Sequence, residues 1–174
     1  MGNGSSSPDP LNQSTPVSVS NISNATAISA GQNYTCAVLS GGTIQCWGSG
    51  RWGKLGNGST SNQTTPVSVS NINTATAISA ADSHTCAVLS GGTVKCWGLG
   101  SSGQLGNGST SNQSTPVSVS NISTATSISA GWGHFCAVLD NKSIQCWGRG
   151  GSGELGNGST SDQSTPVYVV GFGG

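Results

Sequence analysis

The chain contains 174 residues, of which only 6% are charged, and its five basic and five acidic residues cancel at neutral pH. Binding to a polyanion requires clustered Lys and Arg, whereas the basic residues here are scattered, so the composition argues against a nucleic-acid-binding protein. No run of about 18 apolar residues is present, which argues against a membrane-spanning helix, and the first residues have neither the basic nor the apolar region of a signal peptide.

A unit of fifty residues occurs three times and determines the predicted fold class. Its clearest marker is a Cys-Trp-Gly triplet, beginning at Cys46, Cys96 and Cys146, which is followed each time by Leu-Gly-Asn-Gly. Periods of about 40–50 residues with a Trp-Gly signature are typical of β-propeller blades, because one blade cannot bury both of its faces without a neighbour. The sequence therefore predicts an all-β protein, with blades of four antiparallel strands in three tandem repeats plus one spare strand.

In chain order, we expect an N-terminal extra strand and partial repeat at 1–23, blade 1 at 24–73, blade 2 at 74–123, and blade 3 with a C-terminal closing strand at 124–174. The spare strand is expected because the segment from Gly-Asn-Gly to Pro-Val occurs four times and the cysteine hairpin only three times. A propeller needs about four blades to close. Identical chains are therefore expected to complete a ring by homo-oligomerisation, with a dimer favoured, whereas head-to-tail addition without closure would give a filament.

The second unit illustrates the strands that we expect within a repeat. Pro66 is expected at the first position of a strand, where its missing N–H costs least. Glycine and Asn-Gly pairs mark the connections between units. Short alternating segments rich in β-branched residues predict strands at 66–70, 77–80, 85–89 and 93–98.

The six cysteines form three pairs, and the members of each pair lie ten residues apart across a predicted turn. Pairing the flanking strands around a three-residue turn places the two cysteines opposite each other, close to disulfide reach. The alternative is that all six are reduced and buried as small hydrophobic residues. A zinc site is not expected, because no cysteine has another within four residues. The favoured disulfides are Cys36–Cys46, Cys86–Cys96 and Cys136–Cys146.

Disulfides persist in oxidising environments. The favoured pairing therefore predicts an extracellular or cell-surface location for this chain.

The second unit also carries a series of short segments that together are specific for one repeat family. These are Ile78-Ser79-Ala80, His84-Thr85, Ala87-Val88-Leu89, Gly91-Gly92, Trp97-Gly98, the run from Gly103 to Gly108, and Pro116-Val117. They resemble the regulator of chromosome condensation repeat, especially its bacterial extracellular-type members, and the match covers nearly the whole chain. Propellers of this family usually have seven blades in one chain, so three repeats depart from the family pattern.

The resemblance implies a binding platform. Members of the family include a nucleotide-exchange factor for a small GTPase, a plant ultraviolet-B photoreceptor and a secreted β-lactamase inhibitory protein, so the fold alone does not fix the partner. Disulfides would argue against the exchange-factor role. The photoreceptor role would need a cluster of tryptophans, whereas the segment Gly131-Trp132-Gly133-His134 is only faintly similar and occurs once.

Two windows differ most between the three copies, and a ligand-binding face is expected there. The first is the loop before the cysteine hairpin, and the second follows the Cys-Trp-Gly triplet. Both are expected at the same end of a blade, where aromatic residues and Arg are typical interface anchors. The alternative is neutral drift of the loops, with the family's His packed inside the blade. The predicted partner-binding residues are Tyr34, Arg51, Trp52, Lys54, His84, Trp132, His134, Phe135, Arg149 and Glu154.

Other residue types give structural rather than catalytic predictions. Trp47, Trp97 and Trp147 recur in register beside a cysteine, and we interpret them as blade-to-blade packing residues. The acidic residues occur singly, so no carboxylate pair for glycoside cleavage is encoded locally. His84 and His134 occupy equivalent sites without a nucleophile motif. No catalytic residue, metal or cofactor is expected.

The sequence thus predicts a non-enzymatic, propeller-type binding platform or scaffold whose variable loops bind a protein partner. One alternative is a self-assembling structural or fibre protein, in which the open edges of the blades propagate. A second alternative is a carbohydrate-binding lectin, whose glycan partner would depend on Trp52 or Trp132.

Overall fold

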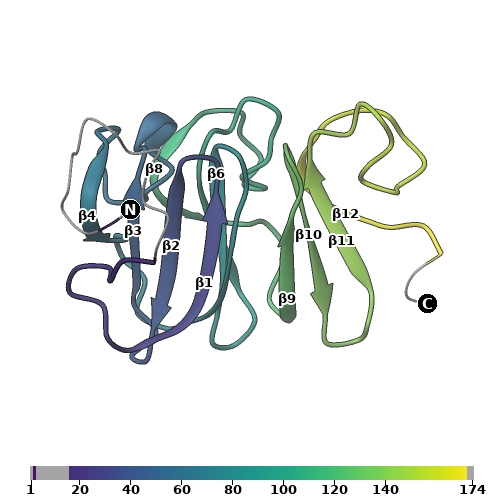
Figure 1. Cartoon of the computed structure of the whole chain (residues 1–174). Helices are drawn as coiled ribbons and strands as arrows, with labels where there is room; N and C mark the ends of the chain where they lie inside the picture. Colours follow the sequence, from purple (N-terminus) through teal and green to yellow (C-terminus); the bar gives the residue numbers. More distant parts are fainter. Residues whose placement is uncertain (1, 3–15, 172–174) are drawn as a thin grey trace.

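The computed structural model describes residues 2 and 16–171 (Figure 1). Three four-stranded antiparallel sheets follow one another along the chain, and within each sheet the strands are neighbours in sequence order. The predicted fold class, all-β with propeller blades of four antiparallel strands, is confirmed.

The three sheets repeat the same arrangement of strands. The first contains β1 (Ala25–Gly31), β2 (Tyr34–Leu39), β3 (Ile44–Gly48) and β4 (Gln63–Ser68), with a short 3₁₀ turn, η1 (Arg51–Gly53), between β3 and β4. The second contains β5 (Ala75–Ala80), β6 (His84–Leu89), β7 (Val94–Gly98) and β8 (Gln113–Ser118). The third contains β9 (Ala125–Ala130), β10 (His134–Leu139), β11 (Ile144–Gly148) and β12 (Gln163–Tyr168).

The strand that carries Pro66 differs from its prediction. Pro66 is the fourth residue of β4, not the first, and β4 pairs with β3 through Cys46 and Val67. This strand therefore completes the first sheet and does not open the second. Proline is tolerated there because β4 is the outermost strand of its sheet. One edge of β4 has no partner strand, so a missing backbone N–H on that edge costs no hydrogen bond within the sheet.

The other predicted strands of the second unit agree with β5, β6 and β7 to within two residues at each end. The predicted extra strand in 1–23 falls largely outside the described residues. Residues 16–23, which are described, form no strand.

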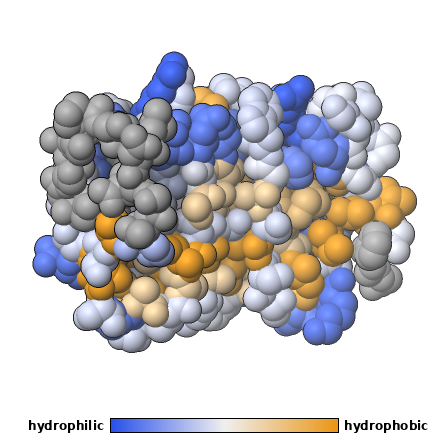
Figure 2. Space-filling model, in the orientation of Figure 1, coloured by the Kyte–Doolittle hydropathy of each residue, from blue (hydrophilic) through white to orange (hydrophobic). Residues whose placement is uncertain are grey.

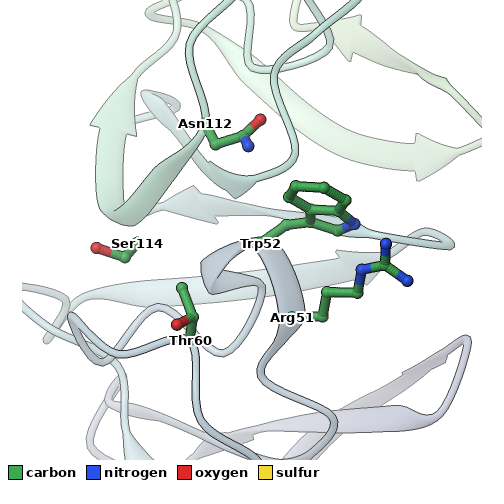
Figure 3. A pocket seen from close by; sticks show the side chains of 5 residues that line it. All are labelled: Arg51, Trp52, Thr60, Asn112 and Ser114. Atoms are coloured by element: carbon green, nitrogen blue, oxygen red, sulfur yellow. The ribbon is translucent and has the colours of Figure 1, made fainter.

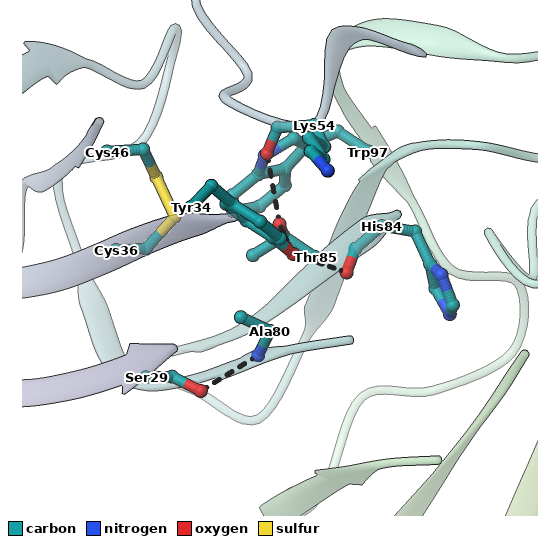
Figure 4. The surroundings of a disulfide bond; sticks show 9 residues. All are labelled: Ser29, Tyr34, Cys36, Cys46, Lys54, Ala80, His84, Thr85 and Trp97. Carbon is teal, nitrogen blue, oxygen red and sulfur yellow. Dashed lines mark hydrogen bonds between the residues drawn. A yellow bond between two sulfur atoms is a disulfide. The ribbon is translucent and has the colours of Figure 1, made fainter. Parts of the chain in front are cut away.

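Each blade carries one disulfide within its central hairpin. Register pairing places Cys36 opposite Cys46, with their Cα atoms 4.1 Å apart (Figure 4). The other two blades repeat this geometry. This spacing suits a pair that is not joined by backbone hydrogen bonds. The predicted cysteine pairing is confirmed, and no described cysteine is free.

The hydrophobic core lies between successive sheets. Val38 and Ile44 of the first blade pack in one cluster with Trp97 of the second, and the corresponding cluster between the second and third blades contains Trp147. Both tryptophans are fully buried. The indole N–H of Trp97 donates to the carbonyl oxygen of Lys54 at 3.0 Å, and that of Trp147 donates to Gln104 at 3.1 Å. Each indole thus joins its blade to the loop of the preceding one.

The two outer faces of this stack are not covered in the same way. Ile28 in β1 is 68% exposed, whereas its counterparts Ile78 and Ile128 pack against the core clusters. At the other end, Tyr168 and Val170 are exposed. Figure 2 shows hydrophobic residues exposed across the middle of one side of the molecule.

The two indole hydrogen bonds can be tested by removing the N–H while keeping an aromatic ring. We expect Trp97→Phe and Trp147→Phe each to lower the free energy of unfolding by about 1–2 kcal/mol more than Trp47→Phe does. Trp47 is the matched control, since it is also buried but its indole has no acceptor among the described residues. The measurement is urea denaturation, and equal losses for the three variants would contradict the proposed role of the N–H.

Candidate functional site

The two variable windows of each blade lie side by side. A backbone hydrogen bond joins them in every repeat: Ser49 N–H donates to the Asn33 carbonyl at 2.8 Å, and the two later blades repeat the contact at 3.0 and 2.9 Å, from Leu99 to Ser83 and from Arg149 to Gly133. The loops that differ most between the copies therefore emerge together at one end of each blade.

The structure divides the ten predicted partner-binding residues into three groups by exposure. Four are buried, so their side chains cannot touch a partner in this arrangement of blades: Tyr34, Lys54, His84 and Phe135. His134 and Glu154 are half-buried. Four are exposed and available for contact: Arg51, Trp52, Trp132 and Arg149.

Tyr34 is part of a buried polar cluster between the first two blades (Figure 4). Its hydroxyl lies 2.8 Å from both the His84 carbonyl oxygen and the Thr85 hydroxyl. The Thr85 hydroxyl lies 3.0 Å from the Lys54 carbonyl, which also accepts from Trp97. Burial raises the pKa of Tyr34, so its phenol stays protonated as a hydrogen-bonding group. Tyr34 therefore holds two blades together and does not contribute to an exposed face.

Lys54 has a structural role that the sequence did not indicate. Its ammonium donates to the Gln32 carbonyl at 2.9 Å and reaches the Asp82 carbonyl at 3.4 Å, so it connects loops of two blades. The same ammonium lies 4.9 Å from the centre of the Tyr34 ring. Burial lowers the pKa of Lys54, and the negative charge of Asp82 opposes this effect.

The junction between the second and third blades replaces this polar cluster with an aromatic contact. His84 occupies the position of Tyr34, and Phe135 occupies that of Thr85. The two rings meet edge to face, with centroids 4.9 Å apart. Both ring nitrogens of His84 are buried without a hydrogen-bond partner among the described residues. Burial consequently lowers the pKa of His84 to about 3.

The exposed residues form two tryptophan–arginine pairs. The Arg149 guanidinium lies 5.0 Å from the Trp132 ring centre, and Arg51 lies 4.7 Å from that of Trp52. Trp132 is 68% exposed, which is unusual for so large an apolar side chain. Arg149 is also held by Glu154, with Nε and Oε1 3.9 Å apart. Each pair presents an exposed aromatic surface beside a positive charge.

A pocket lies beside the first of these pairs (Figure 3). It has a volume of about 500 Å³ and is lined by Arg51, Trp52 and Thr60 of the first blade and by Asn112 and Ser114 of the second. Trp52 adopts a left-handed backbone conformation, with φ of 66°, which non-glycine residues rarely adopt. Figure 3 shows its indole directed across the seam toward Asn112.

A smaller cavity of about 80 Å³ lies between the second and third blades, where His84, Trp132 and Arg149 line its wall. Among the residues that the structure describes, no group of three or more His, Cys, Asp or Glu side chains could hold a metal ion. No helix in the described ranges is long and apolar enough to cross a membrane.

The low pKa of His84 predicts a pH-dependent stability. The unfolded chain takes up a proton near the ordinary pKa of 6.5, whereas folded His84 stays neutral down to about 3. Because the unfolded state binds the proton first, the free energy of unfolding is fully retained above pH 6.5 and falls between pH 6.5 and 3. We expect it to be about 2 kcal/mol lower at pH 5 than at pH 7, as measured by urea denaturation.

The matched control is the double variant His84→Tyr with Phe135→Thr, which rebuilds the pair found between the first two blades. It should lose this difference between the two pH values. If it kept the same pH dependence as the unaltered protein, His84 would not be its source.

Comparison with known proteins supports one family. A model described as "Regulator of chromosome condensation (RCC1) repeat" matches residues 42–88 and 91–138, and a second model of the same description matches 25–51, 75–104 and 125–154. Comparison with curated protein sequences found no significant match.

Several solved structures share the fold. Prp20p from Saccharomyces cerevisiae, whose crystal structure was described with its binding to Gsp1p and histones, has a TM-score of 0.75 at 20% identity over 86% of this chain and 39% of its own. Human WBSCR16 has a TM-score of 0.73 at 22% identity over 83% and 39%. The ectodomain of receptor kinase CR4 from Physcomitrella patens has a TM-score of 0.52 at 25% identity over 79% and 33%.

The chain spans between a third and two fifths of the length of these structures. The likeness to Prp20p and WBSCR16 concerns the fold alone, because identity is low. Since the first family model matches more than half of the residues, the chain belongs to the regulator of chromosome condensation (RCC1) repeat family.

Proposed function

We propose that this chain is a non-enzymatic binding platform that contacts a protein partner through its exposed tryptophan–arginine pairs. The observation that carries the proposal is the Trp132–Arg149 pair, in which an aromatic ring that is 68% exposed stacks with a guanidinium. Trp and Arg are the residues most enriched among interface hot spots. A side chain that is already held in place loses less conformational entropy on binding. Both features favour a partner-binding role for this pair.

The comparisons support this class of function without identifying the partner. Prp20p shares the fold and binds Gsp1p and histones, which makes protein binding a reasonable role for another propeller of the family. The low charge of this chain favours a partner surface that is aromatic or neutral and not strongly charged.

We propose an extracellular or cell-surface location for the chain. The three disulfides support it, because such bonds persist in oxidising environments. The CR4 ectodomain, an extracellular protein of similar fold, is consistent with this setting.

The proposal predicts that Trp132→Ala weakens partner binding while the fold is retained. We expect a loss of about 2 kcal/mol or more, as for a hot-spot residue. Three immobilised proteins would be compared: the unaltered chain, Trp132→Ala and the control Lys142→Ala. The proteins that each captures would be quantified by mass spectrometry. Lys142 is also an exposed residue of the third blade, but it lies in the turn between β10 and β11, outside the variable loops. The affinity of a captured candidate would then be measured with each variant.

A captured protein that binds Trp132→Ala as tightly as the unaltered chain would remove Trp132 from the proposed site. Binding to a glycan array that is lost in Trp52→Ala would instead favour the lectin alternative, since the pocket beside Trp52 is lined by hydroxyl and amide groups.

A second candidate function is self-association through the outer blades. Ile28 is exposed on the first blade although its counterparts are packed, and Tyr168 and Val170 are exposed on the third. An exposed apolar residue such as Ile28, whose counterparts pack against a core, is suited to contact another blade, and Tyr168 and Val170 replace serines of the earlier blades. We propose that the chain is divided into blades at 24–73, 74–123 and 124–174, and that identical chains associate through the first and third of them. The expected product is a homo-oligomer, with a dimer favoured over a fibre.

Native mass spectrometry of the non-reduced protein tests self-association. A dimer or another small closed number is the expected result, and Ile28→Ser should shift the distribution toward the monomer because it makes the exposed face of β1 polar. An open-ended ladder of masses would favour the fibre. A stable monomer at all concentrations would reject the second candidate and leave the binding platform unaffected.

A further inference from the structure

The same seven-residue sequence, Leu-Gly-Asn-Gly-Ser-Thr-Ser, occurs once in each repeat, at 55–61, 105–111 and 155–161. The local turn is also the same in all three copies. The side-chain oxygens of Asn57, Asn107 and Asn157 each accept a hydrogen bond of 3.1 Å from the backbone N–H two residues later. Any difference in the chemistry of these asparagines must therefore come from the surrounding blades.

The surroundings differ at the glycine that follows each asparagine. The N–H of Gly58 donates to the Ser114 carbonyl at 2.9 Å, and that of Gly108 donates to the Ser164 carbonyl at 2.8 Å. Both acceptors belong to the outer strand of the next blade. Among the described residues no blade packs against the third copy, and the N–H of Gly158 has no acceptor there.

The packing around the loops shows the same contrast. A Cβ atom placed on Gly53 or Gly103 would come within 2.5 Å of the neighbouring blade's backbone, whereas on Gly153 it would meet no atom within 4 Å. Gly56 is likewise buried against Trp97, and Gly156 is exposed. The loops of the first two blades are thus clamped by the following blade, while the third is attached only to its own.

We propose that Asn157 is a site of selective, spontaneous deamidation. Hydroxide removes the proton from the Gly158 backbone nitrogen, which attacks the side-chain carbonyl carbon of Asn157. The bond from that carbon to the side-chain nitrogen breaks, and the departing nitrogen takes a proton from water and leaves as ammonia. A five-membered succinimide remains, and hydroxide is regenerated. Water then opens the ring to give aspartate or isoaspartate at position 157.

The hydrogen bond of the following glycine controls the first step. The attacking nitrogen must lose its proton and turn toward the asparagine side chain. At Gly58 and Gly108 that proton is engaged by a carbonyl oxygen of the next blade, and the clamped loop resists the turn. All three glycines are exposed, but the N–H of Gly158 has no acceptor among the described residues, and a Cβ atom placed on Gly158 would meet no atom within 4 Å. Glycine rotates more freely than any residue with a side chain. The three identical sequences therefore differ in reactivity through the fold alone.

The modification would change the charge of the uncovered end of the molecule. The loop 155–161 contains no charged residue, and its conversion product adds one negative charge. Isoaspartate also lengthens the backbone by one carbon within the turn. This inference does not depend on the proposed partner site, because Trp132 and Arg149 lie outside the loop.

The test incubates the folded, non-reduced protein in mildly alkaline buffer, at a dilution where native mass spectrometry shows the monomer, and follows the three sites by mass spectrometry. After reduction, trypsin places the three asparagines in separate peptides, because cleavage after Lys54, Lys95 and Arg149 divides them. We expect conversion at Asn157 to be about threefold to tenfold faster than at Asn57 and Asn107. This is the ratio by which one backbone hydrogen bond shifts the equilibrium between the bonded and the free N–H of the following glycine.

The matched control is the same incubation in denaturant, where the identical sequences should react at equal rates. Asn157→Gln should abolish the fast reaction and leave the other two sites unchanged. Equal rates at the three sites in the folded protein, or fastest conversion at Asn57 or Asn107, would overturn the proposal.

Discussion

The contact between one blade and the loop of the blade before it is the interaction on which this structure depends. A four-stranded sheet exposes apolar side chains on both faces, and burial of that surface supplies most of the stabilisation of a fold with few charges. Trp97 and Trp147 fill the seams, and their indole N–H groups bond to the carbonyls of Lys54 and Gln104. The same loops also carry the variable residues. Packing and recognition therefore share one segment of each repeat.

This shared segment explains why the polar chemistry differs from seam to seam. At the first seam, Tyr34 and Thr85 form a hydrogen-bonded cluster, with the Lys54 ammonium bridging two loops above it. At the second seam, His84 and Phe135 fill the same space with an aromatic contact and leave a neutral imidazole. Phe135 thus places a larger apolar ring where the first seam has the Thr85 hydroxyl. At the outer edge of this second seam, Trp132 and Arg149 pair with each other and stay exposed to solvent.

The fold could be predicted from the sequence further than the site could. The disulfides followed from counting residues around Ser40-Gly41-Gly42, because strand pairing across a short turn admits one register. The placement of β4 could not be predicted in the same way, since a strand between two repeats can pair with either. Variation between copies was read as surface exposure, yet the variable Tyr34 and His84 are buried. Pairs of positions fifty-one residues apart change together, from Tyr34 with Thr85 to His84 with Phe135, and this was the signal that could have placed them in the interior.

Every disulfide of this protein closes a hairpin within one blade, with its cysteines ten positions apart in sequence, and no such bond joins two described blades. Under tension applied through the ends of the chain, the seams between blades would carry the load without covalent reinforcement. The blades would separate and unfold one after another, and the chain segment enclosed by each disulfide could not be extended. Reducing agent would therefore increase the contour length released by each blade without changing the number of mechanical units.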